Sequence, residues 1–448
     1  MMDLIAGIPF FGGFLSTVLP FLAVLGIVVA VHEYGHYIVA RWCGIQAEVF
    51  SIGFGPVVWS RRDRRGTLWQ LAALPLGGYV RFLGDGDGAS RADQVALDRL
   101  APADRARSFH GATVGRRMLT VLAGPFANFL LTLVVFTGLA LWQGIPSNRP
   151  TIGAIAPLPG VAQPLAVGDV ILTVNGEAID RFDGFYRLAG ALPKPGPLTL
   201  EIERNGDRVT LDAPYPFPPL VDGVEPLSPA SAVGLRRGDV ILEADGKPLA
   251  SFGELRQVVV DSGGRPIPLR VWRDGAEIGL EIQPIERDTD NGQGGFERRV
   301  MIGVAGAPLY LPLFETPAPW TAAAYGVSRV TEVITQSLRG MRSILNGSIG
   351  TENLQGPIGI AQISGETASQ GLTSFIVLIG VISTAIGLLN LFPIPVLDGG
   401  HFVAFLIEAV RGRPPSQAAM QLAMSIGLGL ILLLMVFATY NDIMRMVS

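Results

Sequence analysis

The chain of 448 residues is poor in cysteine and in charge, and each shortage excludes a class of protein. Cys43 is the only cysteine, so an intramolecular disulfide and a disulfide-built extracellular scaffold are excluded. Charged side chains make up 16% of the residues and the formal net charge is −4, which argues against nucleic acid as a partner. Hydrophobic residues make up 49%, a share typical of an integral membrane protein that carries a soluble portion.

Four long apolar segments predict four membrane-spanning helices. Each is long enough to cross the hydrocarbon core of a bilayer, which takes about 20 residues. The first segment, residues 1–42, is too long for a signal peptide, and Asp3 stands where a basic region should be. The other three spans are expected at 118–142, 372–397 and 418–440.

Arginine is distributed unevenly around these spans, which predicts their orientation. The segment 43–117 and the short connection 398–417, expected to be a loop, are rich in arginine. By the positive-inside rule both are cytoplasmic. Both termini then lie outside the cytoplasm, together with the long connection between the second and third spans.

The first span contains the motif His32-Glu33-x-x-His36, although the whole chain has only four histidines. Histidines four residues apart on a helix project from one face and can reach one metal ion, with the Glu between them as general base. Ionisable groups at membrane depth are costly and by default mark function. His36 and His32 lie roughly 8 and 14 Å inside the face marked by Arg41, at 1.5 Å per residue. The motif therefore predicts a hydrolytic zinc site near the cytoplasmic face.

A catalytic zinc site normally takes three protein ligands, so a third must come from elsewhere in the chain. The predicted third span ends in Asn390-x-x-Pro393-x-Pro395-x-x-Asp398, and His401 follows. The two prolines cannot continue a helix, and irregular backbone at this depth must be buried in protein or line a wet cavity. Asp398 and His401 both compete for the place of the third ligand.

The connection between the second and third spans contains an internal repeat. The string Gly-Asp-Val-Ile-Leu at 168–172 recurs at 238–242, and the turn signal Asn-Gly at 175–176 recurs as Asp-Gly at 245–246. Such pairs supply the positive φ angles of tight hairpin turns. Two small β-rich domains with one or two helices each are therefore predicted.

The second copy, from Ser228 to Leu242 and the helical stretch beyond, resembles a PDZ domain of the bacterial protease type, and the first copy matches less well. PDZ-like domains are accordingly expected over 150–215 and 216–290. PDZ domains take extended peptides onto a sheet edge, so these copies point to polypeptide partners; the alternative is that they are inert spacers without a peptide groove. A linker with an amphipathic helix is expected over 291–371.

Three motifs together resemble the site-2 protease family of intramembrane metalloproteases. They are the His-Glu-x-x-His of the first span, Gly124-Pro125-x-x-Asn128 of the second, and Asn-x-x-Pro-x-Pro-x-Leu-Asp-Gly of the third. The resemblance implies Zn²⁺ as cofactor, held by His32, His36 and Asp398, with Glu33 as the catalytic base and His401 as a nearby polar support. It also implies that Asn390 contacts substrate or the reacting carbonyl; the alternative is that Asn390 satisfies backbone freed by the prolines.

Segments 48–56, 68–71 and 78–82 read as short strands with turns between them. In the family this region forms a membrane-associated sheet, which implies that its edge pairs with an unwound substrate. A hairpin with a purely structural role is the alternative. The predicted fold is thus a polytopic α-helical membrane protein with four transmembrane helices, two inserted α/β PDZ-like domains and a small membrane-associated β-sheet.

The resemblance also implies a location and substrates. It places the chain in the bacterial inner membrane, with termini and PDZ domains in the periplasm, and implies single-span membrane proteins as substrates. An anti-sigma factor of envelope stress signalling comes foremost, followed by signal-peptide remnants. One alternative is a non-catalytic PDZ membrane adaptor for misfolded envelope proteins, which would have no use for intramembrane charge. Another is a metal transporter, disfavoured because four spans show no inverted repeat.

Overall fold

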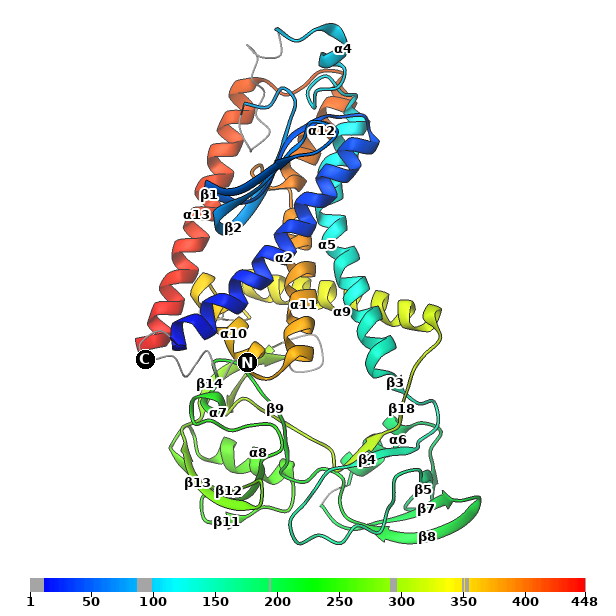
Figure 1. Cartoon of the computed structure of the whole chain (residues 1–448). Coiled ribbons are helices and arrows are strands. Elements are labelled where there is room, and N and C mark those ends of the chain that lie inside the picture. The colour runs from blue at the N-terminus through cyan, green and yellow to red at the C-terminus, as the bar shows by residue number, and fades with distance from the viewer. Residues whose placement is uncertain are drawn as a thin grey trace. The chain divides into compact units, whose positions relative to one another are not determined.

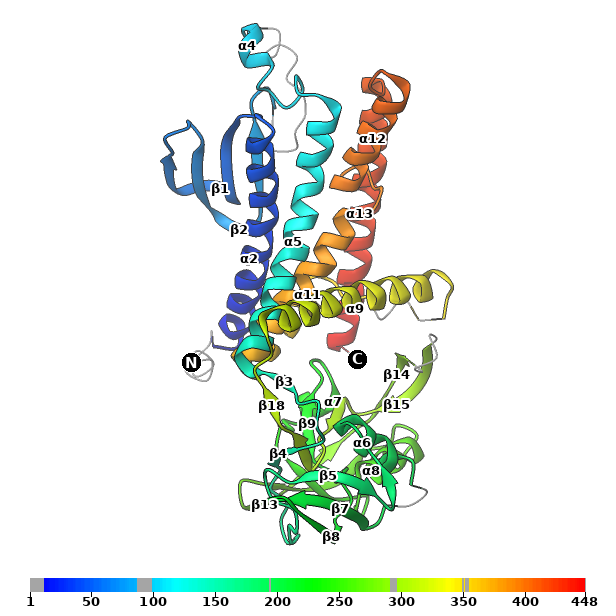
Figure 2. The ribbon, with the colours of Figure 1, turned by 90° about the vertical axis from the view of Figure 1, so that its right-hand side faces the viewer.

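The computed structural model describes residues 12–86, 99–192, 195–290, 296–348, 350 and 354–447. The predictions for Asp3 and residues 1–11 of the first span lie outside the described residues. The chain divides into two compact units, shown in Figures 1 and 2. The membrane unit comprises 1–138, 320–342 and 351–448, and the β unit comprises 139–319 and 343–350.

Within the described residues, four helices of the membrane unit are long and apolar enough to cross a bilayer. They are α2 (Gly12–Trp42), α5 (Val114–Gln143), α11 (Leu372–Asn390) and α13 (Gln417–Val447). The membrane unit also contains the amphipathic helix α9 (Pro319–Leu345) and three shorter helices: α4 (Pro102–Arg105), α10 (Pro357–Ser369) and α12 (Asp398–Arg411). Figures 1 and 2 show α9 lying across the spans rather than along them. A polytopic membrane protein with β domains is therefore confirmed.

The end of the third span differs from its prediction. Helix α11 ends at Asn390, and residues 391–397, which contain both prolines, are irregular as expected. The predicted loop over 398–417 is wrong, because residues 398–411 form helix α12. Asp398 lies in the first turn of α12, where a negative charge favours the helix dipole, and Gly412 ends the helix with φ +69°.

The spans pack through small and hydroxyl-bearing residues. At Gly35 of α2, an added Cβ would lie 2.4 Å from the Ala123 carbonyl oxygen, so these two helices cross in backbone contact. Between α5 and α11, the Thr132 hydroxyl donates to the Gly380 carbonyl at 2.8 Å, and the Ser383 hydroxyl donates to the Asn128 carbonyl at 2.9 Å. Such contacts replace the hydrophobic driving force that is missing in lipid.

A buried carboxylate ties α13 to α10, a helix that the prediction of a linker over 291–371 did not include. Asp442 is 2% exposed and accepts hydrogen bonds from the backbone N–H groups of Gly356, at 3.0 Å, and Gly359, at 2.9 Å. These N–H groups at the start of α10 have no partner within their own helix. Asp442 therefore caps α10 from a neighbouring span.

The small sheet beside α2 has two long strands, β1 (Ala47–Arg62) and β2 (Leu68–Phe82), instead of three short ones. Both strands bend, so residues 49–52 of β1 face residues 78–81 on one side and 68–71 on the other. The far half of the sheet exposes large apolar side chains, among them Val58 and Trp59. Residues 78–82 of β2 lie at the edge nearest the metal-binding motif of α2.

The β unit contains two domains whose four-stranded sheets have the same strand order, β6-β5-β7-β8 in the first and β11-β10-β12-β13 in the second. The first domain contains β4 (Ile152–Ile155), β5 (Val170–Val174), β6 (Glu177–Ala178), α6 (Phe182–Gly190), β7 (Leu198–Arg204) and β8 (Asp207–Ala213). The second contains β9 (Val221–Val224), α7 (Pro229–Ala232), β10 (Val240–Ala244), β11 (Lys247–Pro248), α8 (Phe252–Asp261), β12 (Ile267–Arg273), β13 (Ala276–Ile282), β14 (Ile285–Asp290), β15 (Phe296–Met301) and β16 (Val304–Gly306). Short strands β3 (Ile145–Pro146), β17 (Tyr310–Pro312) and β18 (Phe314–Glu315) complete the unit.

The same ion pair stabilises both copies of the repeat. The Arg204 guanidinium donates to both carboxylate oxygens of Asp169 at 2.8 and 2.6 Å, and Arg273 does the same with Asp239 at 2.7 and 2.6 Å. Burial raises the pKa of Asp169, but hydrogen bonds from Arg204 and a backbone N–H outweigh it and hold that pKa below its usual range. The predicted hairpin turns are confirmed by positive φ angles at Asn175 and Asp245, and Asn205 and Asp274 form a second such pair.

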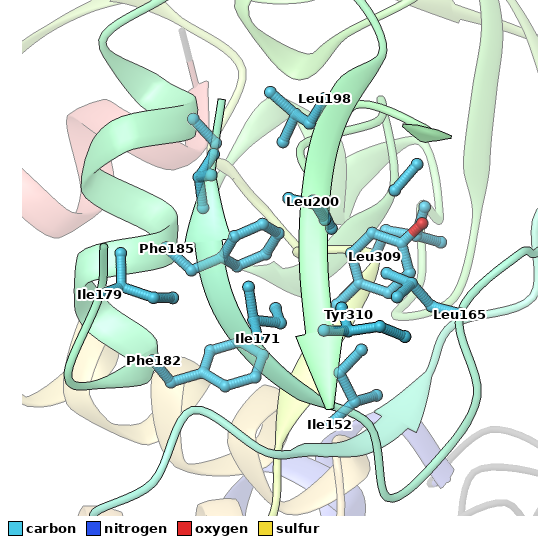
Figure 3. Packing of buried hydrophobic residues seen from close by; sticks show 14 residues of the cluster. Ile152, Leu165, Ile171, Ile179, Phe182, Phe185, Leu198, Leu200, Leu309 and Tyr310 are labelled. Atoms are coloured by element: carbon cyan, nitrogen blue, oxygen red, sulfur yellow. The ribbon is translucent and has the colours of Figure 1, made fainter. Parts of the chain in front are cut away.

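The two domains are nested rather than consecutive, so the predicted ranges 150–215 and 216–290 are too short. Strand β17 pairs with β4 of the first domain, and Leu309 and Tyr310 are fully buried in its core (Figure 3). Strand β16 pairs with β9, which extends the second domain beyond residue 290. The second domain is therefore inserted before the last strand of the first.

Candidate metal centre

Three ligand atoms converge inside the membrane unit. The Nε2 atoms of His32 and His36 are 3.2 Å apart, and they lie 3.0 and 3.4 Å from Oδ2 of Asp398. Among the described residues, these three form the group of His, Cys, Asp or Glu side chains suited to hold a metal ion. Tetrahedral ligands that each bind one Zn²⁺ at about 2.0–2.1 Å stand about 3.3 Å from one another, so the observed spacings fit this ion.

Helix α5 orients both imidazole rings from behind. Nδ1 of His36 donates to the Thr120 carbonyl at 2.8 Å, which fixes the proton on Nδ1 and leaves Nε2 free to bind a metal. Nδ1 of His32 lies 3.2 Å from the side-chain amide of Asn128, which is fully buried. Both rings therefore present Nε2 toward Asp398.

Gly124 of α5 provides the space for these two ring atoms. A Cβ at this position would lie 2.3 Å from Nε2 of His36 and 2.8 Å from Nε2 of His32. No real side chain fits at such distances, so the close approach of α5 to the candidate metal centre requires glycine here.

The turn that precedes α12 positions the carboxylate of Asp398. A Cβ at Gly399 would lie 2.3 Å from the Phe392 carbonyl oxygen, and one at Gly400 would lie 2.3 Å from the Ile394 carbonyl oxygen. The backbone of residues 391–395 thus packs directly against the first turn of α12. Further along that helix, Glu408 forms a 2.7 Å ion pair with Arg117 at the start of α5.

A cavity of about 260 Å³ contains the candidate metal ligands and the other predicted site residues. Its lining includes Glu33 and the edge residues Gly78, Tyr79 and Val80 of β2. The backbone N–H of Val80 donates to the Glu33 carboxylate, and a Cβ at Gly78 would lie 3.1 Å from Cγ of Glu33. A sheet edge therefore borders the candidate general base.

Asn390 and His401 also line this cavity, from the end of α11 and the start of α12. The Asn390 amide donates to the Ile386 carbonyl of its own helix at 3.1 Å, so it satisfies backbone while facing the cavity. His401 lies outside the group of three converging ligand atoms. Geometry therefore favours Asp398 over His401 as the third ligand.

Sequence reasoning did not assign roles to Thr120 and Gly124, and it named Asn128 only as part of a motif. The signal for two of them was the string Gly124-Pro125-x-x-Asn128, because a buried Asn within an apolar span needs a partner. Thr120 contributes a backbone carbonyl, which carries no side-chain signal at all.

The fold and the site define a peptidase class. A family model described as Peptidase family M50 matches residues 20–434, which is most of the chain. The chain therefore belongs to this family, the site-2 proteases, and is a metalloprotease of the site-2 type.

The chain is similar over nearly its whole length to curated bacterial proteins. A putative zinc metalloprotease of Agrobacterium fabrum is 34% identical over 442 residues, which cover 97% of this chain and 98% of the relative. The regulator of sigma-E protease of Escherichia coli is 31% identical over 472 residues, which cover 97% and 99%. The regulator of sigma E protease of Salmonella typhi is 32% identical over 460 residues, which cover 95% and 98%.

Proposed function

We propose that this protein is an inner-membrane zinc endopeptidase that hydrolyses a peptide bond within or near the transmembrane segment of single-span membrane proteins. The convergence of His32, His36 and Asp398 beside Glu33 carries the proposal, because such a group is costly inside apolar spans unless it is used. The family, and the similarity to a putative zinc metalloprotease of Agrobacterium fabrum, support the choice of ion.

His32, His36 and Asp398 would hold the zinc, and the Nδ1 hydrogen bond of His36 keeps that ring in the ligand tautomer. When bound, Zn²⁺ supplies a Lewis acid that polarises a peptide carbonyl and makes water acidic enough to attack near neutral pH. Glu33 faces the same cavity and takes a proton from the attacking water, then passes it to the leaving amine. The Val80 N–H holds the Glu33 carboxylate in place for this transfer.

The edge of β2 serves as the support for an extended substrate. A transmembrane helix has its backbone hydrogen bonds closed, so the scissile carbonyl becomes accessible only after local unwinding. Residues 78–80 line the cavity beside Glu33 and pair with β1 on one side, which leaves their other side toward the site. A substrate strand added there places its carbonyls near the metal ligands. Asn390 contacts this strand or its reacting carbonyl.

A proline at the β2 edge tests this support. Val80→Pro removes the N–H that faces Glu33 and is expected to slow cleavage of a helical span by at least about 10-fold, since the contact that orients the general base is lost and the proline ring distorts this edge. Val80→Ala keeps the N–H and should cleave near the wild-type rate. Val58→Pro, on the exposed far half of β1, is the matched control. Equal rates for Val80→Pro and wild type would contradict the role of the edge.

The two nested domains act as PDZ domains that bind polypeptide on the periplasmic side. A groove of about 680 Å³ between α8 and residues 297–304 of the second domain supports this role. It combines apolar side chains such as Leu255 and Val259 with the guanidinium groups of Arg256, Arg298 and Arg299. The arginines around β1 and after α12 support a cytoplasmic position for the metal centre.

An anti-sigma factor of envelope stress signalling is the foremost proposed substrate, because regulator of sigma-E proteases match nearly the whole chain. Signal-peptide remnants are proposed as further substrates. Cleavage of such a factor would place the chain in regulated intramembrane proteolysis. The second candidate function is that of a non-catalytic PDZ adaptor. The peptide groove of the second domain supports it equally, but an adaptor does not explain the metal-binding group beside Glu33.

A single assay on the purified protein tests the proposal. We expect about one zinc ion per chain and cleavage of a synthetic single-span peptide in lipid vesicles, with the cut mapped by mass spectrometry inside or next to the apolar segment. Chelation should stop cleavage and added Zn²⁺ should restore it. Full zinc content without cleavage of any span would favour the adaptor, and absence of zinc would contradict the metal centre.

A further inference from the structure

We infer that Asn128 is a positioning residue that holds His32 in the tautomer able to bind the metal. This inference rests on the proposed zinc centre and assigns a task to the motif Gly124-Pro125-x-x-Asn128. Two observations motivate it: the side-chain amide lies 3.2 Å from Nδ1 of His32, and Oδ1 of Asn128 is buried without a hydrogen-bond partner when Nδ2 faces the ring.

The chemistry of the ring decides which end of the amide faces it. His32 offers Nε2 to the metal, so its proton must sit on Nδ1, and Nδ1–H needs an acceptor. An amide turned by 180° has the same shape, and in that orientation Oδ1 of Asn128 accepts from Nδ1–H of His32. An amide nitrogen facing the ring would instead require the opposite tautomer, with the proton on Nε2, which cannot bind a metal.

The contact with His32 is the only hydrogen bond of the Asn128 side chain among the described residues. In either orientation one end of this fully buried side chain lacks a hydrogen-bond partner among the described residues, and a leucine of similar size would avoid that cost. A buried polar group that is only half satisfied is explained by its contact with His32.

The backbone around Asn128 is held by α11, which fixes where the amide can reach. The Asn128 carbonyl accepts from the Ser383 hydroxyl at 2.9 Å and from the Thr132 hydroxyl at 3.1 Å. A Cβ at Gly387 would lie 3.1 Å from Cβ of Asn128, so α11 passes directly over this residue. Helix α11 therefore braces the residue that orients His32, and the irregular segment that follows it leads to Asp398 at the start of α12.

Thr120, Gly124 and Asn128 share one face of α5 because they are spaced by four residues. The first accepts from His36, the second leaves room for both Nε2 atoms, and the third contacts His32. One face of the second span thus orients both histidines, through a backbone carbonyl at one end and a side chain at the other.

Three variants of the full-length protein in detergent micelles test the role. Asn128→Leu removes the acceptor, and Asn128→Asp keeps an acceptor and makes it stronger. Ser364→Ala is the matched control, since it removes a fully buried hydroxyl of the membrane unit that bonds the Ile360 carbonyl within α10 and does not line the cavity. The readouts are Zn²⁺ affinity by competition with a chromophoric chelator, the visible spectrum of the Co²⁺-substituted protein, and thermal unfolding.

Asn128→Leu is expected to bind Zn²⁺ about 10–100-fold more weakly than wild type, the range for loss of such a partner, with an altered Co²⁺ spectrum. Asn128→Asp is expected to bind at least as tightly as wild type, because a carboxylate makes the imidazole a better ligand. Ser364→Ala should keep the wild-type affinity and spectrum.

Two results would overturn the inference while leaving the zinc centre intact: wild-type affinity in Asn128→Leu, or equal weakening in Asn128→Leu and Asn128→Asp. If Asn128→Leu fails to fold, Asn128→Asp still decides, because weaker binding than wild type contradicts the need for an acceptor. A wild-type protein that binds no zinc would instead refute the proposed centre on which the inference depends.

Discussion

Purified Asp398→Asn protein is expected to lack stoichiometric zinc and to cleave no single-span substrate. Oδ2 of Asp398 lies within 3.4 Å of both histidine Nε2 atoms, and it contributes the only negative charge among the three ligands. The amide is neutral and a poor zinc ligand, so two histidines alone remain. The loss of affinity should exceed the ~10–100-fold cost of losing an outer partner of a ligand.

The measurement is zinc per chain after dialysis, beside cleavage of a single-span peptide. Asp442→Asn is the matched control: it also neutralises a buried aspartate of the membrane unit, but one that caps α10. It should keep its zinc, because α10 is not part of the cavity lining and the amide oxygen still accepts one of the two backbone hydrogen bonds. Zinc retained at the wild-type level in Asp398→Asn would contradict its role as a ligand.

Glu33→Gln is expected to keep one zinc per chain and to lose cleavage by about 10²–10⁴-fold, the usual contribution of a general base. Glu33 lines the cavity but lies outside the group of three converging ligand atoms. Glutamine keeps the shape of the side chain and can still accept from the Val80 N–H, so packing is preserved while proton transfer is lost.

Two measurements separate zinc binding from proton transfer. One is the initial cleavage rate at saturating substrate, and the other is the zinc content of the protein by emission spectrometry. Glu332→Gln, which removes an exposed carboxylate of α9, serves as the control and should retain full activity. Near wild-type cleavage by Glu33→Gln would refute the assignment of the base. Loss of zinc in Glu33→Gln would show that Glu33 acts as a ligand and not as a base.

Local sequence patterns predicted the parts of the fold that depend on near neighbours in the chain. The run of apolar residues in each span, the four-residue spacing of His32 and His36, and the prolines that end α11 all act within one or two helical turns. The hairpin turns at Asn175 and Asp245 were also predictable from local sequence, because Asn and Asp before Gly tolerate the positive φ angles that these turns require.

Contacts between distant segments decided the rest. A loop was predicted over 398–417 because this segment connects the third and fourth spans, whereas the close packing of Gly399 and Gly400 on the preceding turn fixes the start of α12. The first β domain takes its last strand from residues 310–312, more than 150 residues after β4, and no local signal marks such a pairing.

By itself the sequence determined that this protein carries a two-histidine hydrolase motif inside an apolar span, together with a repeated β domain, because helical periodicity and turn residues are properties of short segments. Only the tertiary structure favours Asp398 over His401 as the candidate third ligand, since that preference depends on which atom of α12 lies within 3.4 Å of both rings on α2. It also assigned the motif at 124–128 its contacts, because Gly124 and Asn128 acquire their roles only where α5 packs against the histidines.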